Sequence, residues 1–300
     1  MTPTHTSTNQ IATTAPSGNV GRHLVHDLVR GGVRPRVLAH RRDGVPAGLD
    51  DHVEVVVVDL ADASALTTAL DGVGALFLTV PALLSEDPLA DYEAFGASVA
   101  RAVEEAGVSH VVLQSSIGAE LRRGAGDIDG LARVEELLDA TPASTLHLRC
   151  GFFFTNLLMQ LDALRAGEVP VVLPVDHPFA WVAPADIAAV ASSWLLRADW
   201  SGRHVQAVHG PADLGWADAL AIVSAATGHD VRPRRISDDD MRASLTGAGM
   251  GAKQVEAVLG MSTGMRDGFV PEQPRDATTT TPTTLGAWAY EVLRPALSTD

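Results

Sequence analysis

Two glycines, Gly18 and Gly21, separate a short β-prone segment from a stretch whose apolar residues repeat at helical spacing, in TTAPSGNVGRHLVHDLV. Residues 20–29 are therefore predicted to form a helix that buries one side. A strand that turns through glycines into a helix directs backbone N–H groups and the positive end of the helix at one point, which suits a pyrophosphate. Two glycines also fit an ordinary strand-to-helix turn, but the strand–helix–strand context favours a dinucleotide site.

The glycine motif departs from its full form, which has three glycines. Ala15 stands at the first of the three positions in G-x-x-G-x-x-G, and Pro16 follows it. Ala15 adds a methyl group where a tight turn favours none, and Pro16 removes one N–H group. The residues predicted to contact the phosphates are Ser17, Gly18, Asn19 and Val20.

Three basic residues, His40, Arg41 and Arg42, follow the second predicted strand, and the next carboxylate is Asp43. An NAD site places an acid here to bind the ribose hydroxyls, whereas arginine holds the 2′-phosphate of NADP. Guanidinium groups form bidentate, charge-assisted hydrogen bonds to phosphate. NADP(H) is therefore the predicted cofactor, and the alternative is a solvated basic loop.

Composition limits the class of protein. The 300 residues are 46% hydrophobic, enough for one large domain or two unequal ones. The net charge of −15 argues against a nucleic-acid partner. No apolar run is long enough to span a membrane, and residues 1–8 do not resemble a secretory signal. The single cysteine, Cys150, fits a reducing compartment, so we expect a cytoplasmic monomer or homodimer with Cys150 in the core.

Predicted strands and helices alternate along the first half of the chain, which indicates an α/β fold with a doubly wound parallel sheet. The β-branched run VEVVVVDL, 53–60, is predicted to be a strand buried on both faces. The other strands are predicted at 10–15, 36–40, 75–80, 110–116 and 144–150, with helices at 20–29, 63–70, 89–106 and 130–138.

The chain is predicted to divide into a Thr/Ser-rich disordered tail, 1–8, a dinucleotide-binding domain and a smaller α/β part. The domain spans 9–153, and 184–210 returns to it. The smaller part, 154–183 and 211–300, is expected to cover the carboxyl edge of the sheet, where α/β proteins bind ligands. Its predicted elements include a strand at 171–175 and a helix at 252–259.

Five segments together resemble the NmrA-like family of atypical short-chain dehydrogenases/reductases: SGNVGRHLV, VVVVDLADASAL, GVSHVVLQSSIGA, LHLRCGFFFTNLL and FAWVAPADIAAVA. They follow the family's order, with Cys150 where proline is usual. The resemblance implies a Rossmann fold and a small-molecule reductase. It also implies further cofactor contacts from Asp59, Leu60, Thr79, Val80, Pro81, Ser115 and Phe152, with an ordinary acid at a helix start as the alternative for Asp59.

The proton donor is not evident from the sequence. Short-chain reductases commonly use a Tyr-x-x-x-Lys pair, but the only lysine is Lys253 and the only tyrosines are Tyr92 and Tyr290. The segment GDIDGLARVEELL, where the family resemblance would place this pair, contains neither residue type. Ser115, His177 and Tyr92 remain the catalytic candidates, with strand-end hydrogen bonding as the alternative for the serine.

Aromatic residues cluster after the sixth strand and are predicted to line a pocket for a small hydrophobic or aromatic substrate, although part of the cluster should be core. The predicted lining is Ser116, Phe153, Phe154, Asn156, His177, Phe179 and Trp181. No metal-ligand spacing is present. Three functions stay open: an NADP(H)-dependent reductase of a carbonyl, enone or quinone-like compound, a dinucleotide sensor without turnover, and a non-redox cyclase or isomerase.

Overall fold

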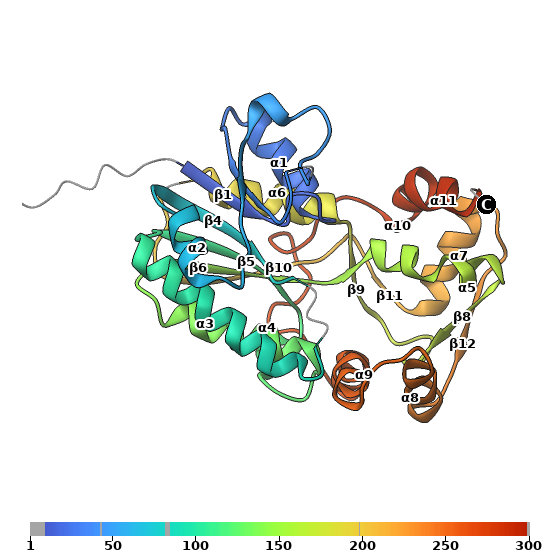
Figure 1. The fold of residues 1–300 in the computed structure, drawn as a ribbon. Helices are drawn as coiled ribbons and strands as arrows, with labels where there is room; N and C mark the ends of the chain where they lie inside the picture. The colour runs from blue at the N-terminus through green and yellow to red at the C-terminus, as the bar shows by residue number, and fades with distance from the viewer. Residues whose placement is uncertain (1–9, 43, 82–84, 198, 299–300) are drawn as a thin grey trace, which may run out of the picture.

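The computed structural model describes residues 10–42, 44–81, 85–197 and 199–298, so the predicted tail 1–8 and Asp43 lie outside the described residues. Seven parallel strands form the main sheet in the order β10-β6-β5-β4-β1-β2-β3 (Figure 1). The strands are β1 (Gln10–Thr14), β2 (Arg36–Ala39), β3 (Glu54–Val57), β4 (Val73–Thr79), β5 (His110–Ser116), β6 (Ser144–Cys150) and β10 (Arg203–Val208). This confirms the doubly wound sheet, whose strand order reverses between β1 and β4.

Helices cover both faces of this sheet (Figure 1). On one face α1 (Gly21–Arg30) packs against α6 (Pro184–Leu195), and apolar side chains such as Leu24 and Ile187 fill the space beneath them. On the other face lie α2 (Ala63–Ala69), α3 (Pro88–Ala106) and α4 (Asp127–Asp139), above a second core. Apolar residues at helical spacing thus account for the packing of both layers.

A smaller α/β part lies beyond the carboxyl edge of the sheet and has its own core, which contains Phe154, Leu220 and Trp288 (Figure 1). Its strands are β7 (Phe152–Phe153), β8 (Glu168–Val171), β9 (Phe179–Val182), β11 (Asp213–Leu214) and β12 (Arg232–Arg235). Its helical segments are a 3-10 helix (Phe154–Gln160), α5 (Leu161–Arg165), α7 (Trp216–Thr227), α10 (Leu285–Trp288), a π-helical turn (Ala289–Leu293) and α11 (Arg294–Ser298). The strand predicted at 171–175 is thus shifted toward the N-terminus.

The helices α8 (Asp238–Gly247) and α9 (Ala252–Arg266) follow β12, and α9 packs against α3 and α4 rather than within the smaller part. Gly264 lets α9 approach the loop before α4 closely, because a Cβ there would lie 2.2 Å from the carbonyl oxygen of Gly124. The helix predicted at 252–259 therefore continues to Arg266. Its contacts with α3 and α4 cannot be predicted from its own sequence pattern.

The two edges of the main sheet differ. Beside β10 runs a C-terminal strap, residues 270–284, in which the Gln273 side chain accepts from Ala207 N (2.6 Å) and donates to Val205 O (3.0 Å). At the other edge, no strand of the described chain pairs with the outer side of β3, and Val57 is 54% exposed. The prediction that this run is buried on both faces is wrong, because a β-branched run reports strand propensity and not position in the sheet.

Candidate functional site

The turn between β1 and α1 has the shape of a phosphate-binding loop. Ala15 adopts φ 48°, in the left-handed region, and its carbonyl accepts a hydrogen bond from Gly18 N (2.9 Å). Gly21 must lack a side chain, since a Cβ there would lie 2.0 Å from that same oxygen. The third motif position therefore needs glycine for close approach, and Ala15 bears the backbone strain of the first.

The N-terminus of α1 is open to an anion. Val20 provides no side-chain cap, and the first turn contains no acidic residue. Within the described residues, the N–H groups of Asn19, Val20 and Gly21 have no hydrogen-bond acceptor. Such groups, with the positive end of the helix, are what a pyrophosphate requires. Because the Val20 side chain is buried, only its backbone is available for this contact.

The other predicted cofactor residues follow strands that end at the same edge. Thr14 joins the ends of β1 and β4, between which the strand order reverses, because its Oγ1 accepts a hydrogen bond from Thr79 N (2.8 Å). His40, Arg41, Arg42 and Asp59 are exposed, Thr79, Val80, Pro81 and Phe152 are half-buried, and Leu60 is buried. Parallel pairing thus brings the predicted set together, and the residues present fit a phosphorylated dinucleotide.

Ser115 belongs to a buried ionic network. Its hydroxyl donates to Glu135 Oε1 (2.7 Å), and Arg149 binds both oxygens of Glu135 (3.1 and 2.9 Å). Burial acts to raise the pKa of the Glu135 carboxyl, but the hydrogen bonds and positive charge of Arg149 and the charge of His147 hold that pKa below its usual range. Because Ser115 is 3% exposed and already bonded, we do not propose that it contacts substrate.

The network extends to the strap. Arg149 Nη1 also binds Glu272, and Glu272 N donates to Glu120 Oε1 (3.1 Å). Arg122 adds a third cationic contact, to Glu135 Oε2 (3.0 Å). Sequence reasoning missed this cluster. An arginine within the apolar strand LHLRC was the available signal, but its partners lie on other elements.

Four aromatic rings pack together where β7 meets β9: Phe152, Phe179, Trp181 and Trp216. Phe152 and Phe179 are half-buried, with ring centroids 5.6 Å apart. Trp181 is 1% exposed and donates its indole N–H to Leu214 O (3.0 Å).

Phe154 is also 1% exposed and packs on Trp288. Phe154 and Trp181 are therefore core residues, and the prediction that they line the pocket is wrong. The half-buried rings of Phe152 and Phe179 remain candidates for the pocket lining.

The remaining predicted pocket residues are half-buried. Ser116 Oγ donates to Ile117 O (2.9 Å), and Phe153 packs against the core beneath α6. His177 lies in the loop before β9, where its amide donates to Pro174 O (3.0 Å), and Asn156 lies in the 3-10 helix after β7.

Cys150 is 1% exposed, and burial raises the pKa of its thiol, which confirms the expected core residue.

Tyr92 is held between two helices. Its ring lies against Gly130 of α4, where a Cβ would meet Tyr92 Cγ at 2.3 Å. Burial raises the pKa of the phenol, as does the negative charge of nearby Asp127. Sequence reasoning singled out Tyr92 but missed Asp127, since an aspartate at the start of a helix is common for reasons of the helix dipole alone.

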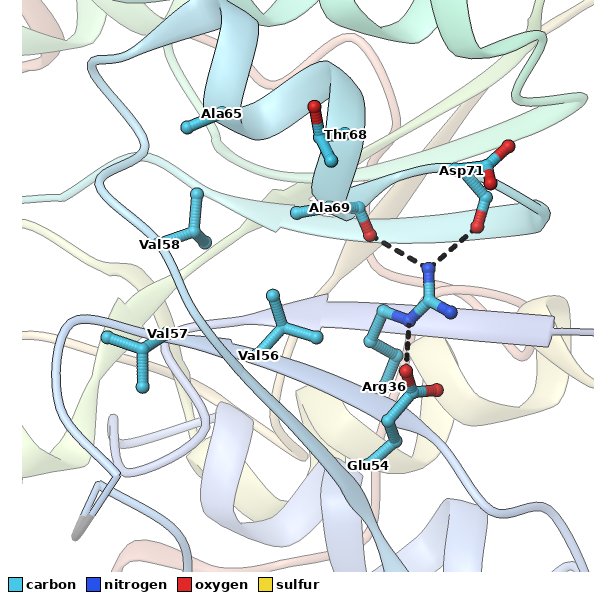
Figure 2. Close-up of a pocket in the computed structure, with 9 residues that line it drawn as sticks. All are labelled: Arg36, Glu54, Val56, Val57, Val58, Ala65, Thr68, Ala69 and Asp71. Carbon is cyan, nitrogen blue, oxygen red and sulfur yellow. Dashed lines mark hydrogen bonds and ion pairs between the residues drawn. The ribbon is translucent and has the colours of Figure 1, made fainter.

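A surface depression of about 400 Å³ lies elsewhere, along the flank of β3 beneath α2. Figure 2 shows Arg36 at one end of it, bonded to Glu54 and to the carbonyls of Ala69 and Asp71. None of the phosphate-loop residues lines it.

The described residues contain no group of three or more side chains that could hold a metal ion. None of their helices combines the length and apolar character needed to cross a membrane.

A glycine turn with open amides, arginines after the second strand and a strand order that reverses at that point define a dinucleotide-binding α/β protein. Residues 16–146 match the family model described as NAD(P)H-binding. The chain is 30% identical over 209 residues to an NAD(P)H azoreductase of Xenophilus azovorans, covering 69% of this chain and 70% of that protein. It is 31% identical over 236 residues to a (4-alkanoyl-5-oxo-2,5-dihydrofuran-3-yl)methyl phosphate reductase of Streptomyces griseus, covering 78% and 80%.

Solved structures agree with the fold. An NADPH-dependent quinone oxidoreductase from Escherichia coli, in complex with NADPH, matches with a TM-score of 0.78 at 21% identity, over 94% of this chain and 99% of that one. A triphenylmethane reductase from Citrobacter matches with a TM-score of 0.76 at 16% identity, over 94% and 99%. The chain therefore belongs to the NmrA-like family of atypical short-chain dehydrogenases/reductases, which includes NAD(P)H-dependent reductases, and the resemblance of its motifs to that family is confirmed.

Proposed function

We propose that this protein is an NADP(H)-dependent reductase of a hydrophobic carbonyl, enone or quinone-like small molecule. The observation that carries the proposal is the placement of Arg41 and Arg42 at the sheet edge where the amides of Asn19 and Gly21 have no acceptor. The amides would hold the pyrophosphate, and the guanidinium groups would hold the 2′-phosphate that distinguishes NADP from NAD.

The substrate would lie against the half-buried rings of Phe152 and Phe179. When bound, the reduced nicotinamide supplies a hydride. The residues Thr79, Val80 and Pro81 would pass beneath that ring, and the aromatic side chains would orient a flat acceptor and exclude water. Relatives named as an azoreductase and a quinone oxidoreductase favour a conjugated acceptor.

The choice of cofactor is tested by calorimetry on the double variant Arg41→Ala/Arg42→Ala. We expect NADPH affinity to fall by roughly 10- to 100-fold, because charge-assisted hydrogen bonds to the 2′-phosphate are lost, while NADH affinity stays within about twofold. Arg34→Ala, an exposed arginine just before β2, is the matched control. Equal losses for both dinucleotides would contradict the assignment.

Turnover is tested by incubating the protein with NADPH and a panel of quinones and enones. Oxidation of NADPH above background supports the reductase. Tight NADPH binding without oxidation by any acceptor would instead favour the sensor, the second candidate, which the absence of a Tyr-x-x-x-Lys pair motivates. If the protein does not bind NADPH, the non-redox cyclase or isomerase remains as the candidate function.

A further inference from the structure

One carboxylate near the sheet edge, at the N-terminus of α4, has a buried oxygen without a hydrogen-bond partner among the described residues. This carboxylate is Asp127, the first residue of the helix, and the oxygen is Oδ1. Two residues later, Asp129 uses both oxygens to bind the amides of Gly124 (2.7 Å) and Ala125 (2.8 Å). The loop before α4 is therefore held by Asp129, and Asp127 is left for another role.

Tyr92 lies beside Asp127. The tyrosine ring rests on Gly130, one helical turn after Asp127 and on the same face of α4. Burial raises the pKa of the Tyr92 phenol, and the negative charge of Asp127 raises it further. The two side chains therefore form a neighbouring pair between α3 and α4.

The pair is placed where the reacting end of the cofactor is expected. The helix α3 follows β4 and α4 follows β5, and these two strands are adjacent in the sheet. Both helices therefore begin at the carboxyl edge of the sheet, where Asp127 is the first residue of α4 and Tyr92 lies near the start of α3. Ligands in open α/β sheets bind at this place.

We propose that Asp127, with Tyr92 beside it, is the proton donor of the reduction, an inference that rests on the proposed function. The hydride brings an electron pair to the electrophilic carbon of the carbonyl or enone. The displaced π pair moves to the oxygen, or to the α-carbon of the enone, which takes the proton from the Asp127 carboxyl group. A proton from bulk solvent then restores the carboxylic acid, so each turnover adds one hydride and one solvent proton to the acceptor.

The surroundings of Asp127 favour the acid form. Burial raises the pKa of its carboxyl, so it keeps a proton at a higher pH than a surface aspartate does. The charged groups of α9 are engaged elsewhere: Lys253 with Asp87, Glu256 with Arg242, and Arg266 with Asp238. On α3 the facing group is Tyr92, and on α4 it is the loop-bound Asp129. A carboxylic acid is the usual donor type when its pKa is tuned upward in this way.

The kinetic test compares Asp127→Asn with Glu136→Gln, an exposed acid on the same helix. The amide keeps the shape of the carboxyl and loses no hydrogen bond at Oδ1, so the variant should fold with an unchanged melting temperature. We expect its kcat to fall by about 10²-fold, with NADPH affinity unchanged. Wild-type kcat should fall as pH rises through the pKa of Asp127, and this limb should be absent from Asp127→Asn.

If Asp127→Asn has the same kcat and the same pH profile as the wild type, the proton-donor assignment is wrong, whereas the proposed reductase function is unaffected. A wild-type protein that binds NADPH but turns over no acceptor would instead refute the proposed function.

A second readout needs no cofactor. The chain contains two tyrosines, so tyrosine labelled with carbon-13 at Cζ gives two NMR signals, which Tyr290→Phe assigns. The Tyr92 signal should shift with a midpoint above the usual carboxyl range, and Asp127→Asn should abolish that step. A Tyr92 signal with no such step, or a step that survives in Asp127→Asn, would show that the pair is not coupled and would overturn the proposal.

Discussion

Ala15 holds a backbone conformation that suits glycine. Its φ of 48° costs an L side chain about 1–2 kcal/mol, whereas glycine adopts it readily but is freer in the unfolded chain. We predict that Ala15→Gly raises the free energy of unfolding by about 0.5–1 kcal/mol, measured by urea denaturation. Ala61→Gly, in a turn with ordinary φ, should lower it. A loss of stability in Ala15→Gly would show that the loop relieves the strain in another way.

Gly21 is the opposite case and the internal comparison for Ala15. A Cβ at Gly21 would lie 2.0 Å from the Ala15 carbonyl oxygen, so Gly21→Ala must displace the loop and should weaken NADPH binding. At Gly18 the corresponding distance is 3.1 Å, and Gly18→Ala should be milder. The distance from each added Cβ to the backbone, and not the glycine motif alone, therefore determines which substitution in this loop is more harmful.

At the scale of elements, Asp186 connects two segments far apart in the chain. The helix dipole explains an acid in the first turn of α6, but Asp186 also accepts from Thr283 N (2.9 Å) and Thr283 Oγ1 (2.7 Å). It thereby fixes the strap just before Thr284, whose side chain caps α10 by accepting from Ala287 N.

We predict that Asp186→Ala lowers the free energy of unfolding by about 2 kcal/mol, because two partly buried donors lose their acceptor. Chemical denaturation measures the change. Thr283→Val, which keeps the backbone bond and removes only the hydroxyl contact, should lower it by about 1 kcal/mol. If Asp186→Ala unfolds at the wild-type midpoint, the strap is held by its other contacts.

For the molecule as a whole, the sequence was sufficient to predict strands of the main sheet because the strand propensity of β-branched residues is local information. β5 and β6 match their predicted bounds, and α2 begins at Ala63 as predicted. The edge position of β3, the packing of α9 on α4 and the core position of Trp181 depend on which elements meet. The partners of Arg149 are Glu135 and Glu272, which lie 14 and 123 positions away along the chain. No periodicity in the sequence indicates such pairings.

The buried Glu135–Arg149 pair links β6, α4 and the strap, so it should set the acid stability of the fold. The pKa of Glu135 is held below its unfolded value, so the pair's contribution is present above that value and is lost as pH falls through the folded pKa. We predict that Glu135→Gln lowers the free energy of unfolding by about 3 kcal/mol at pH 7, because Arg149 is left partly unpaired in the core. The gap to wild type should narrow as pH falls below about 4.

Urea midpoints at several pH values measure both effects. Glu136→Gln, which removes only a surface ion pair with Arg133, should change little at any pH. A deficit in Glu135→Gln that stays constant between neutral and acid pH would mean that the lost contact is steric and that the charge of Glu135 contributes nothing. A narrowing deficit would show that the charge of Glu135, paired with Arg149 between α4 and β6, stabilises the fold at neutral pH.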